Sequence, residues 1–161
     1  MSMYKEMSKT IREEYKKRSD LYKTRLVKWG ADPAVVRIDK PTNIARARSL
    51  GYKDITGVIV ARVRVVKGKR KRAVHGGGRK PSKSGRFFSR AESLQRIAEG
   101  RAARRFINCE VLNSYPVGST GTTAFFEVLL LDRKGPAVLA RKEYRNLLEN
   151  KGRTFRGLTN A

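Results

Sequence analysis

The pattern of hydrophobic and polar positions divides the chain into helical and extended segments. Near the N-terminus, Met7, Ile11 and Tyr15 are spaced by four residues, and most positions between them are polar. Because residues four apart lie on the same face of a helix, this spacing predicts one amphipathic helix over residues 3–28. Gly30 follows as a residue that can end this helix.

Two strands and a second helix are predicted in the next forty residues. Val35–Ile38 is a short apolar run that is typical of a strand. A short helix is predicted between Thr42, as its N-cap, and Gly51, as its stop. Ile55–Val66 is rich in Val and Ile, and its second half alternates valine with arginine, which predicts a strand with one inward face.

The second half of the chain predicts a helix, a hairpin and a final helical segment. Ser89-Arg-Ala-Glu92 fits a capping box and predicts a helix over residues 89–105. Glu110–Tyr115 and Thr123–Asp132 are predicted strands, joined by a Pro- and Gly-containing turn. The second of these strands is apolar on both faces, which indicates a central strand, and Pro136–Asn150 predicts one or more helices.

These elements predict an α+β fold with a small, largely antiparallel sheet packed with helices. A length of 161 residues is typical of one domain, so we expect a single domain over residues 1–161. A long basic loop or extension at about residues 67–88 interrupts it. This segment contains three consecutive glycines and cannot form a hydrophobic core, so we expect residues 67–86 to be disordered until RNA orders them.

The charge of the chain points to a polyanionic partner. The formal net charge is +24, from 38 basic and 14 acidic side chains. Residues 67–106 contain fourteen basic and two acidic groups, so a quarter of the chain carries +12, half of the excess. Nucleic acid is the leading candidate partner, and an anionic membrane surface is the second. The candidate RNA-binding residues from this distribution are Arg62, Arg64, Lys67, Lys69, Arg70, Lys71, Arg72, His75, Arg79, Lys80, Lys83, Arg86, Arg90, Arg101, Arg104 and Arg105.

The sequence offers few residues suited to catalysis or metal binding. His75 is the one histidine and lies beside the glycines, whereas Cys109 begins a strand and is typical of a small core residue. The segment Gly76–Ser82 lacks the spacing of a phosphate-binding loop. We therefore predict no enzyme activity, no cofactor and no metal. Neither a signal peptide nor an apolar run long enough for a membrane span is found, so we expect a soluble, intracellular protein.

Several of these features also have interpretations that do not involve RNA binding. The basic loop has the composition of a disordered linker or a localisation signal. Arg101, Arg104 and Arg105 also suit the C-terminal end of a helix dipole, and Lys16–Arg18 suits a solvated helix face. Phe87 and Phe88 either stack on a splayed base or pack in the core.

Four motifs in order resemble the archaeal and eukaryotic type of large-subunit ribosomal protein fifteen. This family differs from the bacterial protein of the same number, and the first motif looks more archaeal than eukaryotic. The resemblance covers nearly the whole chain. The motifs are Arg46-Ala-Arg-Ser-Leu-Gly-Tyr-Lys53, Val111-Leu-Asn-Ser-Tyr-Pro-Val-Gly118, Phe125-Phe-Glu-Val-Leu-Leu-Leu-Asp132 and Thr154-Phe-Arg-Gly-Leu-Thr-Asn-Ala161.

The resemblance implies a structural, non-enzymatic role in the cytoplasmic large ribosomal subunit, with rRNA and neighbouring ribosomal proteins as partners. It implies a globular α+β body with basic extensions that enter ribosomal RNA. Family members usually continue past the last motif into a basic tail, whereas this sequence stops at Ala161, so tail contacts are not carried over. The positions carried over are Arg46, Arg48, Tyr52, Lys53, Asn113, Tyr115 and Arg156, and Arg153 directly precedes the last motif.

Three functional hypotheses follow. The first is a structural constituent of the large subunit that stabilises folded rRNA by charge neutralisation. The alternative is a basic DNA-binding or nucleoid-associated protein, which should prefer duplex DNA, although no helix-turn-helix is evident. The third, an RNA-modifying enzyme, lacks a catalytic constellation.

Overall fold

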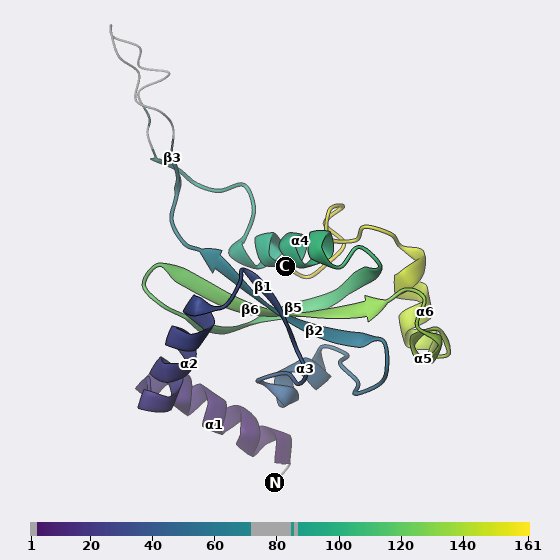
Figure 1. Ribbon diagram of the computed structural model, residues 1–161, viewed down its shortest axis with the longest axis horizontal. Coiled ribbons are helices and arrows are strands. Elements are labelled where there is room, and N and C mark those ends of the chain that lie inside the picture. Colours follow the sequence, from purple (N-terminus) through teal and green to yellow (C-terminus); the bar gives the residue numbers. More distant parts are fainter. Residues whose placement is uncertain (1–2, 72–84, 86) are drawn as a thin grey trace, which may run out of the picture.

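The computed structural model describes residues 3–71, 85 and 87–161 (Figure 1). Its centre is a four-stranded antiparallel sheet of order β1-β2-β6-β5, which confirms the predicted α+β fold. Strand β6 lies in the middle of the sheet, and its residues Ala124–Leu131 are all buried, as expected for a strand covered on both faces. The strands are β1 (Val35–Ile38), β2 (Val58–Val66), β5 (Cys109–Ser119) and β6 (Thr123–Asp132).

Helices cover both faces and one end of this sheet. On one face, Ala98 and Ala102 of α4 (Leu94–Arg105) pack against the valines of β2 and the apolar side of β6. On the other face, α3 (Ile44–Ser49) and the loop after it pack Ala47 and Tyr52 against Tyr115. At the end of the sheet, α5 (Pro136–Leu139) and α6 (Lys142–Glu149) surround Leu131. Figure 1 shows the C-terminus beside α4.

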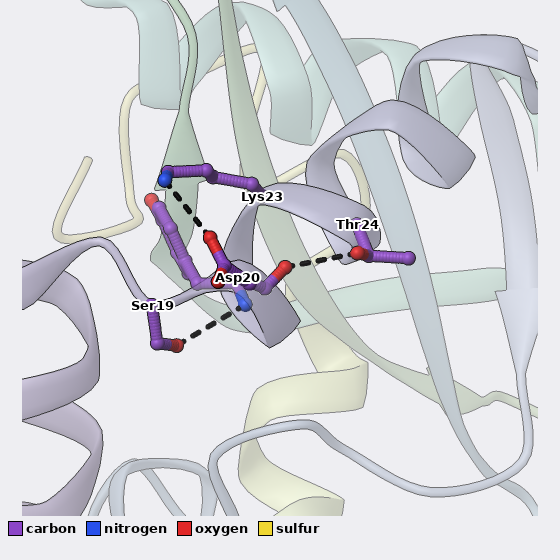
Figure 2. Close-up of polar contacts among 5 residues, drawn as sticks. Ser19, Asp20, Lys23 and Thr24 are labelled. Carbon is purple, nitrogen blue, oxygen red and sulfur yellow. Dashed lines mark hydrogen bonds and ion pairs between the residues drawn. The ribbon is translucent and has the colours of Figure 1, made fainter.

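The predicted single N-terminal helix is in fact two helices, α1 (Met3–Lys17) and α2 (Asp20–Ala31). Arg18 adopts a left-handed φ of 48°, and the Ser19 side chain then accepts a hydrogen bond from the Tyr22 amide (Figure 2). A serine that caps a new helix competes with the continuation of the old one, and the apolar spacing alone does not reveal this break.

Two predicted helix starts are also wrong. Asn43, not Thr42, caps α3, because Thr42 is held by a carboxylate of the sheet. Ser93, not Ser89, caps α4 by accepting a hydrogen bond from the Arg96 amide, so the helix is shorter than predicted. Each true cap lies within four residues of the predicted one, and each candidate is of a type that caps helices well.

The hairpin and the glycine stops differ from the prediction as well. Strand β5 continues to Ser119, through the segment predicted as a turn, and register irregularities at Pro116 and Gly118 accommodate the proline. Gly30 lies inside α2 rather than ending it, whereas Gly51 has a φ of +95° at the end of α3, as predicted. The strand predicted from Ile55 begins three residues later, at Val58.

A two-stranded ribbon forms the base of the predicted basic extension. Strand β3 (Arg70–Lys71) pairs with β4 (Phe87–Phe88). This ribbon projects from the body of the protein in Figure 1. A Cβ added at Gly85 would lie 2.6 Å from the Phe88 ring, so this ring sits directly over the glycine. Most of the segment that we predicted to be disordered, residues 72–84 and 86, lies outside the described residues.

Three buried carboxylates attach irregular segments to this framework. Glu127 on β6 accepts hydrogen bonds from the Thr42 amide at 3.1 Å, from the Thr42 hydroxyl at 2.5 Å and from the Tyr115 hydroxyl. Glu110 on β5 accepts from the Gly152 amide at 2.9 Å. Glu99 on α4 accepts from the Thr159 hydroxyl at 2.6 Å and from the Ser114 hydroxyl. These side chains are 0–6% exposed, so the contacts are desolvated and strong.

Glycine substitutions should distinguish the helical glycine from a turn glycine. Gly30→Ala should raise the free energy of unfolding by about 0.5–1 kcal/mol, because α2 continues through this position and the added methyl meets open space. Gly57→Ala should lower it by about 1–3 kcal/mol, because φ is +94° and the new Cβ would lie 2.8 Å from Cγ2 of Val138. Urea unfolding followed by circular dichroism measures both. Equal effects of the two changes would contradict the helical conformation of Gly30 and the left-handed conformation of Gly57.

The titration of Glu127 should make the free energy of unfolding depend on pH. Burial raises the pKa of this carboxyl above its ordinary value of 4.5, so the folded state binds its proton more tightly than the unfolded state. Its contribution to stability is therefore greatest below pH 4.5 and declines as pH rises through the raised pKa. The unfolding free energy of the wild type minus that of Glu127→Gln should therefore fall as the pH rises above 4.5.

Glu143→Gln provides the control of opposite sign. The hydrogen bond and charge of Lys53 lower the pKa of this exposed carboxyl, so its contribution is present above the ordinary value and disappears on acidification. Urea unfolding at a series of pH values measures both differences. A Glu127 difference that stays constant or rises with pH would refute the assignment.

Candidate nucleic-acid interface

A basic groove runs along the outer side of α4, and we call it the α4 groove. Its volume is about 290 Å³, and three arginines of α4 line it: Arg96, Arg101 and Arg104. Phe155 forms the opposite wall, with the Arg104 guanidinium carbon 5.4 Å from its ring centroid. Arginines held against an aromatic ring are pre-organised to bind phosphate and to stack on bases.

The C-terminal segment forms the second wall of the α4 groove. The two carboxylates Glu110 and Glu99 hold Gly152 and Thr159, and the chain between them turns back over α4. The Thr154 side chain lines the groove and is 3% exposed, and its hydroxyl has no hydrogen-bond partner within the described part of the chain. Buried hydroxyls usually have a hydrogen-bond partner, so this atom is an exception among the described residues.

A second basic groove lies on the opposite face, between α1 and α3, and we call it the α1–α3 groove. Its volume is about 820 Å³. The predicted residue Arg46 lines it, and Arg48 stacks on Tyr4 nearby, with 5.6 Å from its guanidinium carbon to the ring centroid. Three further lining residues were not predicted from the sequence: Lys5, Lys9 and Arg12. Lys16 also lines the groove, and it belongs to the cluster Lys16–Arg18, whose sequence suits either a solvated helix face or phosphate contact. The spacing of these four cations, four, three and four residues, places them on one helix face and is the signal that could have found them.

Several predicted residues are engaged inside the protein. Arg62 forms an ion pair with Asp32 at 2.8 Å and lies 4.8 Å above the Trp29 ring centroid, and its side chain is only 13% exposed. Arg153 donates hydrogen bonds to two backbone carbonyls, those of Val111 and Leu158.

Other predicted cations make one internal contact and keep part of their surface. Arg64 donates to the Gly30 carbonyl, and Arg101 to the Arg64 carbonyl at 2.7 Å. Lys53 pairs with Glu143 at 2.6 Å, Lys67 donates to the Thr120 carbonyl, and Arg156 to the Lys151 carbonyl.

The remaining candidates lie on the ribbon, near α4 or beyond the described residues. Lys69, Arg70 and Lys71 are exposed at the base of the ribbon, and Arg105 is exposed at the end of α4. Arg90 is half-buried before the helix. The candidates Arg72, His75, Arg79, Lys80, Lys83 and Arg86 lie outside the described residues. The structure thus brings Arg46, Arg101 and Arg104 into the two grooves and places Lys69, Arg70 and Lys71 on the ribbon, whereas the other described candidates line neither groove.

Cys109 packs beside the α4 face of the core. Burial raises the pKa of its thiol, which keeps it protonated and a poor nucleophile. Within residues 3–71, 85 and 87–161, no cluster of three or more His, Cys, Asp or Glu side chains could hold a metal ion. In the same residues, no helix is long and apolar enough to cross a membrane.

The family model for ribosomal L15, of the L15e type, matches residues 2–161. This chain belongs to that family. A Picrophilus torridus relative, named large ribosomal subunit protein eL15, is 46% identical over 94% of this chain and 82% of its own length. Relatives of the same name are 44% identical in Metallosphaera sedula, over 99% of this chain and 75% of that protein, and 42% identical in Methanocorpusculum labreanum, over 99% and 85%.

Family membership confirms the resemblance seen in the motifs and makes this chain a structural ribosomal protein rather than an enzyme. The structure shows that two of the carried-over family positions are core residues. Tyr52 is 6% exposed, and Tyr115 is fully buried and donates its hydroxyl to Glu127. Part of the family motif therefore maintains the fold.

Truncation of Arg62 should destabilise the protein. Arg62→Ala removes the ion pair with Asp32 and the contact with Trp29, so the free energy of unfolding should fall by about 2 kcal/mol. Arg105→Ala, at an exposed position, should change it by less than about 0.5 kcal/mol. Chemical denaturation without RNA measures both. An Arg62→Ala protein as stable as the wild type would show that this arginine has no structural role.

Proposed function

We propose that this chain is a structural constituent of the large ribosomal subunit that binds and stabilises folded large-subunit rRNA. The α4 groove is the observation that carries this proposal, because three arginines and an aromatic ring line one groove. Phosphates are the natural occupants, because arginine pairs with them bidentately and their negative charges offset the +24 of the chain. The relatives named as large ribosomal subunit proteins support the same assignment.

Charge neutralisation is the proposed mechanism. Grooves on both faces of the sheet allow the protein to lie between rRNA segments whose phosphates would otherwise repel each other. The ribbon of β3 and β4 projects from the body, and we propose that the basic segment up to about residue 88 binds the same RNA. The protein then resides in the cytoplasm, within the subunit, beside neighbouring ribosomal proteins.

Removal of the groove arginines should weaken RNA binding in a salt-dependent manner. The double variant Arg96→Ala and Arg104→Ala should lower the affinity for a folded large-subunit rRNA transcript by about ten- to a hundredfold at low salt, since two phosphate contacts are lost. The slope of log K against log salt should become shallower by roughly 1.5 to 2. Filter binding over a series of salt concentrations measures both quantities.

Two control variants accompany this measurement. Arg145→Ala removes an exposed arginine that bonds the Leu139 carbonyl far from the groove, and it should leave both quantities nearly unchanged. Glu92→Gln removes the carboxylate that lies 3.8 Å from Arg96 and should raise the affinity. Equal loss in all the arginine variants, or tighter binding of duplex DNA than of the folded transcript in competition, would contradict the proposal.

A further inference from the structure

An apolar pocket with aromatic walls lies between α1, α2 and the β5–β6 hairpin, and we call it the aromatic pocket. Its volume is about 480 Å³. Tyr15, Tyr22 and Trp29 line it, and Tyr15 and Tyr22 meet edge to face with ring centroids 5.8 Å apart. Tyr15 is 51% exposed and forms the outer part of the wall, whereas Tyr22 and Trp29 are nearly buried and form the inner part.

Hydrogen bonds and close packing hold Tyr22 in this wall. At the corner between α1 and α2, the Ser19 hydroxyl accepts a hydrogen bond from the Tyr22 amide. Its hydroxyl accepts a hydrogen bond from the Ser119 amide of the hairpin at 3.2 Å. A Cβ at Gly118 would lie 2.9 Å from Leu26 and 3.1 Å from the Tyr22 oxygen, so the hairpin approaches α2 as closely as glycine permits. The pocket is therefore a formed feature of the protein.

The aromatic pocket adjoins the α1–α3 groove. Arg12, Lys16 and Asn43 line both, so the same side chains form the wall between an apolar hollow and a basic channel. Arg12 and Lys16 are exposed on α1. The arrangement places cations at the mouth of the pocket and aromatic rings inside it, as in sites that bind single-stranded nucleic acid.

We propose that the aromatic pocket receives one unstacked RNA base while the phosphates of the same strand follow the α1–α3 groove. This inference rests on the proposed function and specifies a site for it. The base packs against Tyr15, Tyr22 and Trp29, and polar side chains at the rim, those of Asn43 and Ser119, face its edge. Arg12 and Lys16 neutralise the phosphates on either side of that base.

An apolar side chain of a neighbouring protein is the competing occupant. The charge of the surroundings favours RNA, since Lys5, Lys9 and Arg46 continue the basic lining away from the shared wall. Glu13 and Glu14 are the carboxylates that line the two cavities, and they are paired within the protein with Lys17 and Arg25. A strand of phosphates therefore matches the channel better than an uncharged peptide does.

The single tryptophan makes the pocket directly observable. Trp29 is the one tryptophan of the chain and lines the pocket, so its fluorescence reports on an entering base. The full chain is titrated with a ten-residue oligoadenylate and with an abasic ribose-phosphate oligomer of equal charge. We expect quenching by oligoadenylate only, with about tenfold tighter binding than that of the abasic oligomer, because one stacked base supplies the difference. Equal affinities without quenching would overturn the proposal.

Substitutions at Tyr15 test the wall without disturbing the core. Tyr15→Ala should reduce the affinity for oligoadenylate about tenfold and leave that for the abasic oligomer unchanged. Tyr15→Phe keeps the ring and should bind as the wild type does. Leu21→Ala, at an exposed α2 position outside the pocket, is the matched control and should bind normally. Normal binding of oligoadenylate by Tyr15→Ala would count against a stacked base.

A crosslink in the assembled particle separates RNA from protein as the occupant. The photoreactive substitution Tyr15→p-benzoylphenylalanine, in purified large subunits, should crosslink to rRNA. A crosslink to a ribosomal protein would overturn this inference and leave the proposed function intact, since the α4 groove lies on the other face of the sheet. Absence of any RNA binding by the full chain would overturn both.

Discussion

The buried hydrogen bonds of Glu127 are the contacts on which most of the architecture depends. This carboxylate lies on the central strand and binds the amide and hydroxyl of Thr42, 85 residues away in sequence, as well as the Tyr115 hydroxyl of the neighbouring strand. It therefore fixes the start of α3 against the sheet, and α3 in turn supports α1. Glu110 on β5 and Glu99 on α4 attach the C-terminal segment in the same way, through Gly152 and Thr159.

This use of carboxylates resolves a conflict between fold and charge. A chain that is 39% hydrophobic and carries +24 has limited apolar surface for holding its loops, and its cations repel one another. Buried carboxyl groups attach the loops instead, because each accepts two or more hydrogen bonds and needs no apolar surface. They also leave the outer surfaces to cations. The α4 groove, for example, has Glu92 facing three arginines.

The basic residues divide into two kinds that composition does not distinguish. Arg62 and Arg153 are packed or bonded within the body, where they stabilise α2 and the C-terminal segment. Arg96, Arg104 and the lysines of α1 line grooves instead. The two grooves lie on opposite faces of one thin sheet, so a single small body presents positive charge in two directions. The rigid sheet between them sets the distance at which two RNA segments would be held.

The sequence determined the sheet, because strand signals depend on local alternation and on continuous apolar runs. The central position of Thr123–Asp132 and the largely antiparallel sheet were predicted correctly. The four motifs determined the family, since their order survives over the whole chain. The net charge indicated a polyanionic partner. The spacing of the basic residues along α1 also places them on one helix face, the face that lines the α1–α3 groove.

The tertiary structure alone decided the rest. Thr42 and Asn43 are both of a type that caps helices, and Asn43 caps α3 while Glu127, far away in sequence, binds Thr42. Arg62 and Arg64 belong to an alternating pattern that predicts an outward face, yet α2 folds over that face and engages both side chains. The aromatic pocket joins residues of two helices and a hairpin about a hundred positions apart. Local sequence sets which backbone conformations are favourable, but long-range contacts choose among those of nearly equal energy.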